Sequence, residues 1–196
     1  FNSSSSSQKW IKLLIPNYYK MASNPNLIII SSSNGKNLEL SKKFLEKSNE
    51  LKISSEILDL TELNIPLYNP RIHSKNEIPS EIISLKNKLF ETEKWIICAP
   101  EYNGSIPPIL SNFIAWLSVS GDDFRNLFNG QPIAIATFSG GPGIELITSL
   151  RIQLAHLGSQ VVGRHLSSNY SKPADENTIE DILKRLMQMN RLTLDN

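Results

Sequence analysis

Short apolar runs alternate with amphipathic stretches along most of the chain, a pattern that predicts alternating buried strands and helices. From residue 26 onward, the apolar runs predict five strands: Leu27–Ile30, Ile53–Leu58, Trp95–Ala99, Pro132–Phe138 and Val161–Val162. The stretches between and after them predict five helices, at about residues 37–48, 79–90, 107–118, 144–157 and 176–191. Strands and helices in this order predict an α/β fold, in which a five-stranded parallel sheet carries helices on both faces.

A parallel sheet of this size has two common forms. One is the flavodoxin-like fold with strand order 2-1-3-4-5, and the other is a truncated dinucleotide-binding fold. The hydrophobic pattern by itself does not choose between them.

The composition fits one domain of this kind. The chain has 196 residues, 40% of them hydrophobic, which suffices for one α/β core without disulfides or metals. The single cysteine, Cys98, excludes an intramolecular disulfide, and no apolar run approaches the ~20 residues needed to cross a bilayer. A net charge of +1 provides no general attraction for nucleic acid or an anionic membrane. We therefore expect no nucleic-acid partner, no membrane association and no metal site.

The N-terminal end differs from the rest of the chain. Residues 1–38 contain four lysines and no acidic residue, and they begin with Phe1 and a run of serines. We expect residues 1–25 to be an extension, either a disordered or non-native leader or an organellar transit peptide. Residues 26–196 would then form a single domain. The corresponding location is cytoplasmic, or an organelle if the extension is a transit peptide.

Three loops carry the candidate chemistry, because ligands of open α/β sheets bind beyond the carboxyl ends of the strands. The loops after the first, third and fourth predicted strands are rich in Ser, Gly, Asn and Pro. The first loop precedes a helix N-terminus, where backbone amides and the helix dipole favour a phosphate group. An ordinary capped turn is the alternative interpretation. The predicted binding residues in this loop are Ser31, Ser33, Asn34, Lys36 and Asn37.

The loop after the third strand is the most specific feature of the sequence. Residues 99–118 read APEYNGSIPPILSNFIAWLS, and this run closely resembles the signature of the NADPH-dependent FMN reductase family. The resemblance extends more loosely from Asn26 to about Gly163 and includes the SGGPG run at residues 139–143. The first loop departs from the family pattern, because the family commonly has Gly-Ser-x-Arg there and this chain has no arginine. The departure leaves the preference between NADPH and NADH open.

The resemblance implies a flavodoxin-like three-layer sandwich that binds FMN. It also implies NAD(P)H as the hydride donor, a quinone, azo compound, free flavin or similar small molecule as the electron acceptor, and a homodimer or homotetramer. No catalytic side chain is expected, because the cofactor carries the redox chemistry. The further residues that we expect to bind the cofactor are Pro100, Glu101, Tyr102, Asn103, Gly104, Ser105, Ser139, Gly140, Gly141 and Gly143.

Two other functions fit the same fold. A flavodoxin-type electron carrier would bind FMN and dock to protein partners, but such carriers usually depend on an acidic face and this chain has a pI near 8.0. A binding module that has lost its flavin is the second alternative, and the missing arginine of the first loop gives it some support.

Overall fold

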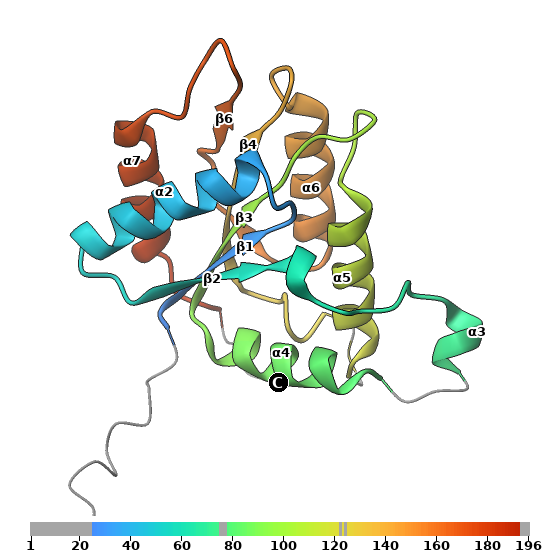
Figure 1. Ribbon diagram of the computed structural model, residues 1–196. Helices are drawn as coiled ribbons and strands as arrows, with labels where there is room; N and C mark the ends of the chain where they lie inside the picture. The colour runs from blue at the N-terminus through green and yellow to red at the C-terminus, as the bar shows by residue number, and fades with distance from the viewer. Residues whose placement is uncertain (1–24, 75–77, 122, 124, 193–196) are drawn as a thin grey trace, which may run out of the picture.

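The computed structural model describes residues 25–74, 78–121, 123 and 125–192 (Figure 1). Except for Pro25, the expected extension of residues 1–25 lies outside this part of the chain. The strands are β1 (Leu27–Ser31), β2 (Ser55–Asp59), β3 (Lys94–Cys98), β4 (Pro132–Phe138), β5 (Gln160–Val161) and β6 (Leu166–Ser168). The helices are α2 (Lys36–Glu50), α3 (Pro70–His73), α4 (Ser80–Glu91), α5 (Pro108–Val119), α6 (Ile144–His156) and α7 (Glu176–Met187), with a 3-10 turn, η1, at Leu60–Glu62.

The strands form one parallel sheet in the order β2-β1-β3-β4-β5, which confirms the flavodoxin-like order. The register places Ser31 of β1 and Ala136 of β4 opposite Cys98 of β3. The central strands β1, β3 and β4 therefore reach the same edge of the sheet. The loops that follow these three strands start side by side, as the sequence pattern predicts.

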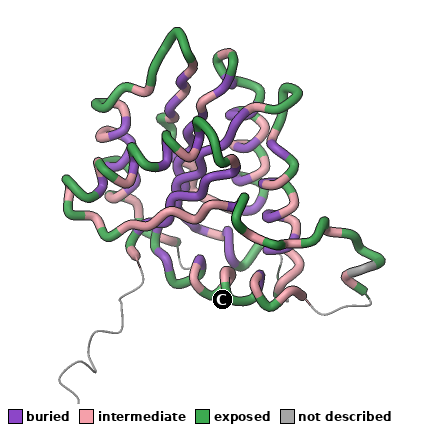
Figure 2. Tube along the Cα trace, in the orientation of Figure 1, coloured by how far each residue is buried: buried purple, intermediate pink, exposed green. Residues whose placement is uncertain are grey.

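Each face of the sheet has its own apolar core, so the fold is a three-layer sandwich. On one face, Ile28, Trp95 and Ile133 pack in a cluster with buried residues of α4, α5 and α6. On the other face, Leu27 and Ile96 share a cluster with α2 and α7. Figure 2 shows that the buried residues gather on the strands and on the inner sides of the helices.

The sheet has one strand more than predicted. Strand β6 covers Leu166–Ser168 and pairs in parallel with the last three residues of β4, beyond the point where β5 ends. Its three residues are too few to show an alternating or continuous apolar pattern. The strand forms because β4 is longer than β5 and leaves the end of β4 without a neighbour on that side.

Several boundaries also differ from the prediction. Strand β2 begins two residues later, because Lys52 has a φ of 58° and the chain is still turning out of α2 at Ile53. The expected long loop after β2 contains η1 and the single turn α3. The last helix ends at Met187 and not at Arg191, whose guanidinium instead donates to the carbonyls of Phe90, Asn126 and Leu127.

The two edges of the sheet are of different kinds. At one edge, every residue of β2 is half-buried, and Glu56 forms an ion pair with Lys88 of α4. At the other edge, β5 and β6 are short segments of two and three residues. None of the helices in the described ranges is long and apolar enough to cross a membrane.

The core positions lead to a stability prediction. The side chain of Phe44 in α2 is fully buried, whereas that of Phe90 in α4 is 49% exposed. We expect Phe44→Ala to lower the free energy of unfolding by about 3–5 kcal/mol, because it removes buried apolar area and leaves a cavity. The matched control Phe90→Ala should cost clearly less. Urea unfolding of both variants measures the difference, and equal losses would contradict the assignment of Phe44 to the core.

Candidate functional site

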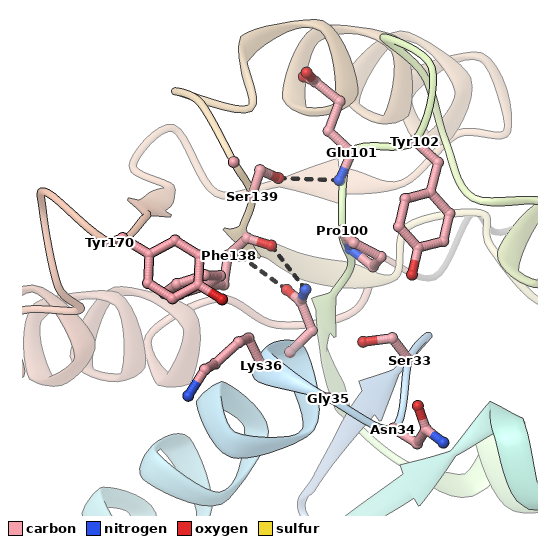
Figure 3. A pocket seen from close by; sticks show the side chains of 12 residues that line it. Ser33, Asn34, Gly35, Lys36, Pro100, Glu101, Tyr102, Phe138, Ser139 and Tyr170 are labelled. Carbon is pink, nitrogen blue, oxygen red and sulfur yellow. Dashed lines mark hydrogen bonds between the residues drawn. The ribbon is translucent and has the colours of Figure 1, made fainter.

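A cleft of about 260 Å³ lies beyond the carboxyl ends of β1, β3 and β4 and is open to solvent. Figure 3 shows the side chains around it, which come from the loops after these three strands, the start of α2, the end of β4 and the loop after β6. Nine of the fifteen predicted site residues line the cleft. They are Ser33, Asn34, Lys36, Asn37, Pro100, Glu101, Tyr102, Ser139 and Gly140.

The first loop presents an uncapped helix start to the cleft. Residue Gly35 is the N-cap of α2, and the structure shows no side-chain hydrogen bond to this cap. A Cβ at Gly35 would meet no atom within 4 Å, so the space in front of the helix is open. Because the first N–H groups of a helix have no partner within the helix, this end is suited to an anionic oxygen.

Two other predicted residues of the first loop, Ser31 and Lys36, have different roles. The hydroxyl of Ser31 is buried and donates to the carbonyl of Ser33 at 2.8 Å, so it shapes the loop from below and does not line the cleft. Lys36 is exposed at the mouth of the cleft and pairs with Glu39 at 2.8 Å. The hydrogen bond that Lys36 donates to Glu39 raises the pKa of the lysine above its ordinary value.

The side chain of Asn37 joins two loops. Its Nδ2 donates to the carbonyl of Phe138 at 2.9 Å, and its Oδ1 accepts from the N–H of Phe138 at 2.8 Å. The nitrogen and the oxygen of the side-chain amide are thus both bonded to the main chain of Phe138. Asn37 therefore lines the cleft from a position that is fixed by the end of β4.

The loop after β3 contains a tight turn at its tip. Tyr102 and Ser105 exchange two main-chain hydrogen bonds of 3.1 and 3.0 Å, and the residues between them, Asn103 and Gly104, have φ angles of 52° and 65°. Two positive φ angles in a two-residue turn define the type I′ geometry, for which Asn-Gly is a preferred sequence. Asn103, Gly104 and Ser105 are exposed and do not line the cleft, whereas Tyr102 does.

A chain of hydroxyl groups fixes the loop after β4 against the loop after β3. The Glu101 N–H donates to Ser139 Oγ at 3.0 Å, and Thr137 Oγ1 donates to the carbonyl of Ala99 at 2.6 Å. The two hydroxyls lie 2.8 Å apart. Because Thr137 gives its only proton to Ala99, the proton between the hydroxyls comes from Ser139. Each hydroxyl thus donates once and accepts once.

The carboxylate of Glu101 reaches across to helix α6. Its Oε2 accepts a hydrogen bond from the N–H of Leu146 at 3.1 Å, in the first turn of this helix. A carboxylate is favoured there, because the helix dipole places positive charge at the N-terminus. Glu101 therefore positions its own loop relative to α6 while it lines the cleft.

The two remaining glycines of the β4 loop lie outside the cleft lining. Gly143 is the N-cap of α6 and has a φ of 68°. A Cβ at this position would lie 2.8 Å from Cγ2 of Thr137 and 3.3 Å from Oγ of Ser139, so the close approach requires glycine. Gly141 has open space around it, and its carbonyl accepts from Asn169 at 3.4 Å.

Three residues of the lining were not predicted: Gly35, Phe138 and Tyr170. Gly35 and Phe138 are sequence neighbours of predicted residues, so a prediction of continuous segments would include them. Tyr170 had no signal of this kind, because it follows the unpredicted strand β6. Its ring packs edge-on against that of Phe138, with the centroids 5.1 Å apart.

The chemistry of the cleft fits FMN. The end formed by Ser33, Gly35 and Lys36 offers a hydroxyl, open helix N–H groups and a positive charge, the donors that a phosphate requires. Aromatic side chains of Tyr102, Phe138 and Tyr170 line the rest of the cleft and match an aromatic ring system. Among the described residues, no group of three or more His, Cys, Asp or Glu could hold a metal ion.

The contacts around Gly143 lead to a second stability prediction. We expect Gly143→Ala to lower the free energy of unfolding of the flavin-free protein by about 1–3 kcal/mol, since the alanine would keep a positive φ and press on Thr137. The matched control is Gly141→Ala, which meets open space. Urea unfolding compares the two variants. If Gly141→Ala were as costly as Gly143→Ala, the close approach of Gly143 to Thr137 could not be the cause.

Comparisons with known proteins identify the family of the chain. A family model described as NADPH-dependent FMN reductase matches residues 25–172, and this span contains the loops after β1, β3 and β4. A quinone reductase of Escherichia coli strain K12 is 33% identical over 78 residues, which is 40% of this chain and 40% of that protein. The match therefore spans less than half of the curated relative.

Similar solved structures confirm the fold. FerB of Paracoccus denitrificans, described as a flavoenzyme NAD(P)H:(acceptor) oxidoreductase, has a TM-score of 0.66 and 17% identity, covering 84% of this chain and 98% of that chain. A flavodoxin from the domain Archaea has a TM-score of 0.58 and 13% identity, covering 82% and 98%. The fold alone is shared by both, so it does not distinguish a reductase from a carrier. The family match covers most of the sequence, and the chain belongs to the NADPH-dependent FMN reductase family.

Proposed function

We propose that the protein binds FMN in this cleft and uses NAD(P)H to reduce a small acceptor such as a quinone, an azo compound or free flavin. One observation carries the proposal: the uncapped start of α2 and the family signature loop after β3 line the same cleft. The family match and the name of the quinone reductase relative support it.

The phosphate of FMN would be held at the first loop. The hydroxyl of Ser33, the first N–H groups of α2 and the ammonium group of Lys36 are the available donors. A lysine there supplies the positive charge for which the family commonly uses arginine. The absence of the arginine is therefore compatible with flavin binding, which speaks against a flavin-less module.

The ring system of FMN would lie between the loops after β3 and β4. Pro100 and Tyr102 contribute one wall, and Gly140 allows the main chain of the opposite loop to come close because it carries no side chain. When bound, FMN would supply the redox chemistry, which is two-electron transfer between NAD(P)H and the acceptor. The protein orients the ring and excludes water from one side of it.

The direct test is reconstitution with FMN followed by assay of NADPH and NADH oxidation with a quinone present. We expect a bound yellow chromophore and oxidation of at least one nucleotide. Bound flavin without turnover would favour the electron carrier. No flavin after addition of FMN would overturn the proposal and favour a binding module.

The proposed place of the phosphate leads to a more specific prediction. We expect Lys36→Gln to raise the Kd for FMN roughly fivefold, because it removes a partly solvated charge pair with the phosphate. The Kd for riboflavin, which lacks the phosphate, should not change. Fluorescence titration with both flavins measures this, and Lys42→Gln on the same helix is the control. Equal weakening of both flavins would place the phosphate elsewhere.

We further propose that the protein is a homodimer that associates through α6. Ile144 and Ile152 are 50% and 66% exposed, and Thr148 lies between them at the same helical spacing. These positions form an uncharged stripe on the outer face of α6. Such a stripe on a two-fold axis can pack against its own copy.

The dimer is tested by the mass of the protein in solution. We expect light scattering to give twice the chain mass for the natural sequence and the chain mass for Ile152→Lys, since a lysine would be buried without a partner at the interface. The control Ile83→Lys, at an exposed position of α4, should stay dimeric. A natural sequence that is monomeric at high concentration would contradict the proposal.

A further inference from the structure

A second, smaller groove adjoins the cleft on the other side of Lys36 and Phe138. Its volume is about 100 Å³, and it runs between α2 and the segment that connects β6 to α7. Lys36 and Phe138 line both the groove and the cleft, so the two spaces share a wall. The complete lining is Lys36, Glu39, Leu40, Lys43, Phe138, Ser168, Pro173 and Ala174.

The groove combines apolar walls with an available positive charge. Leu40 belongs to α2, Phe138 ends β4, and Pro173 and Ala174 lie between β6 and α7. Apolar side chains from three segments therefore line the groove and form an apolar slot suited to a flat ring. Lys43 follows Leu40 by three residues on the same face of α2 and is exposed. Within the described part of the chain, it forms no ion pair or hydrogen bond. Its ammonium group is therefore free to bind an anion at the edge of the slot.

The two lysines of the groove differ in this respect. Lys36 is paired with Glu39 and faces the proposed phosphate end of the cleft. The hydroxyl of Ser168 is also in use, since it donates to the carbonyl of Thr137 at 2.8 Å. Lys43 is thus the group in this lining that is best placed to favour an anionic ligand over a neutral one.

We propose, on the basis of the function proposed above, that the groove takes the adenosine end of NADPH and that Lys43 binds its 2′-phosphate. An electron donor must place its nicotinamide beside the flavin in the cleft, so its other end has to lie on an adjoining surface. The groove is such a surface, and its apolar slot matches an adenine ring. The 2′-phosphate is the only group that distinguishes NADPH from NADH, and it carries negative charge. Lys43 therefore makes NADPH the preferred donor.

The proposal is tested first by binding, without any assay of the reaction. The probes are 2′,5′-ADP, which carries the 2′-phosphate, and 5′-AMP, which is the same molecule without it. Calorimetry is done on the flavin-free protein and again with excess FMN, so that binding in the cleft is separated from binding in the groove. We expect Lys43→Gln to weaken the binding of 2′,5′-ADP roughly fivefold, the effect of one exposed charge pair, and to leave the binding of 5′-AMP unchanged.

The neighbouring Lys42 offers a matched control, because it is also an exposed lysine of α2 but does not line the groove. Lys42→Gln should bind both probes like the natural sequence. The inference is overturned if Lys43→Gln binds 2′,5′-ADP normally, if both variants weaken it equally, or if 2′,5′-ADP does not bind the natural sequence at all.

Steady-state kinetics separate this inference from the proposed function. If the protein oxidises nicotinamide nucleotides, Lys43→Gln should raise the KM for NADPH roughly fivefold while the KM for NADH and both kcat values stay unchanged. Equal effects on NADPH and NADH would overturn the role of Lys43 and leave the reductase function intact. If neither nucleotide is oxidised, the reductase function fails, while the binding measurements still decide whether the groove recognises a 2′-phosphate.

Discussion

The paired hydrogen bonds between Asn37 and the main chain of Phe138 hold the site together. They tie the first turn of α2 to the end of β4 at 2.9 and 2.8 Å, across the end of β3 that lies between them. A buried amide that lost these partners would leave a main-chain N–H and carbonyl unsatisfied, at a cost of about 1–3 kcal/mol for each group. The position of the helix N-terminus relative to the β4 loop therefore depends on this one side chain.

The second tie is formed by the hydroxyl chain from Glu101 through Ser139 and Thr137 to Ala99. It connects the loops after β3 and β4, just as Asn37 connects those after β1 and β4. The end of β4 is consequently fixed from two sides. All three cleft-forming loops are held by side chains that do not depend on a ligand, so the walls of the cleft are in place before anything binds.

The sequence predicts the elements best where the hydrophobic pattern of a short segment is sufficient. Buried strands such as β1 and β3 are continuous apolar runs, and their existence could be predicted directly. The strand order required the family resemblance, because pairing between distant segments leaves no trace in hydrophobic periodicity. Strand β6 and, with it, Tyr170 could not be predicted, since three residues carry no pattern and pair only because β4 is longer than β5.

For single residues, the sequence predicts which loops form the cleft better than it predicts what each side chain bonds to. Asn37 and Ser31 are predicted to bind a ligand, and the structure shows that their side chains also hold the loops in shape. Asn103 and Gly104 form a type I′ turn at the tip of the signature loop and lie outside the cleft lining. A polar side chain can form hydrogen bonds with the protein or with a ligand. The sequence does not distinguish these two roles, because the hydrogen-bond partners are known only from the structure.

The edges of the sheet have a consequence for how this protein can associate with others. A long, flat edge strand offers unpaired N–H and carbonyl groups to which a foreign strand can add. Here β2 carries a charged residue, Glu56, that is paired with α4, and the opposite edge consists of the short segments β5 and β6. A charged side chain on one edge strand and short segments at the other edge both disfavour strand addition. Growth of fibres through the sheet is thereby disfavoured, and the side chains of the helices and loops are left as the surfaces through which this protein would assemble.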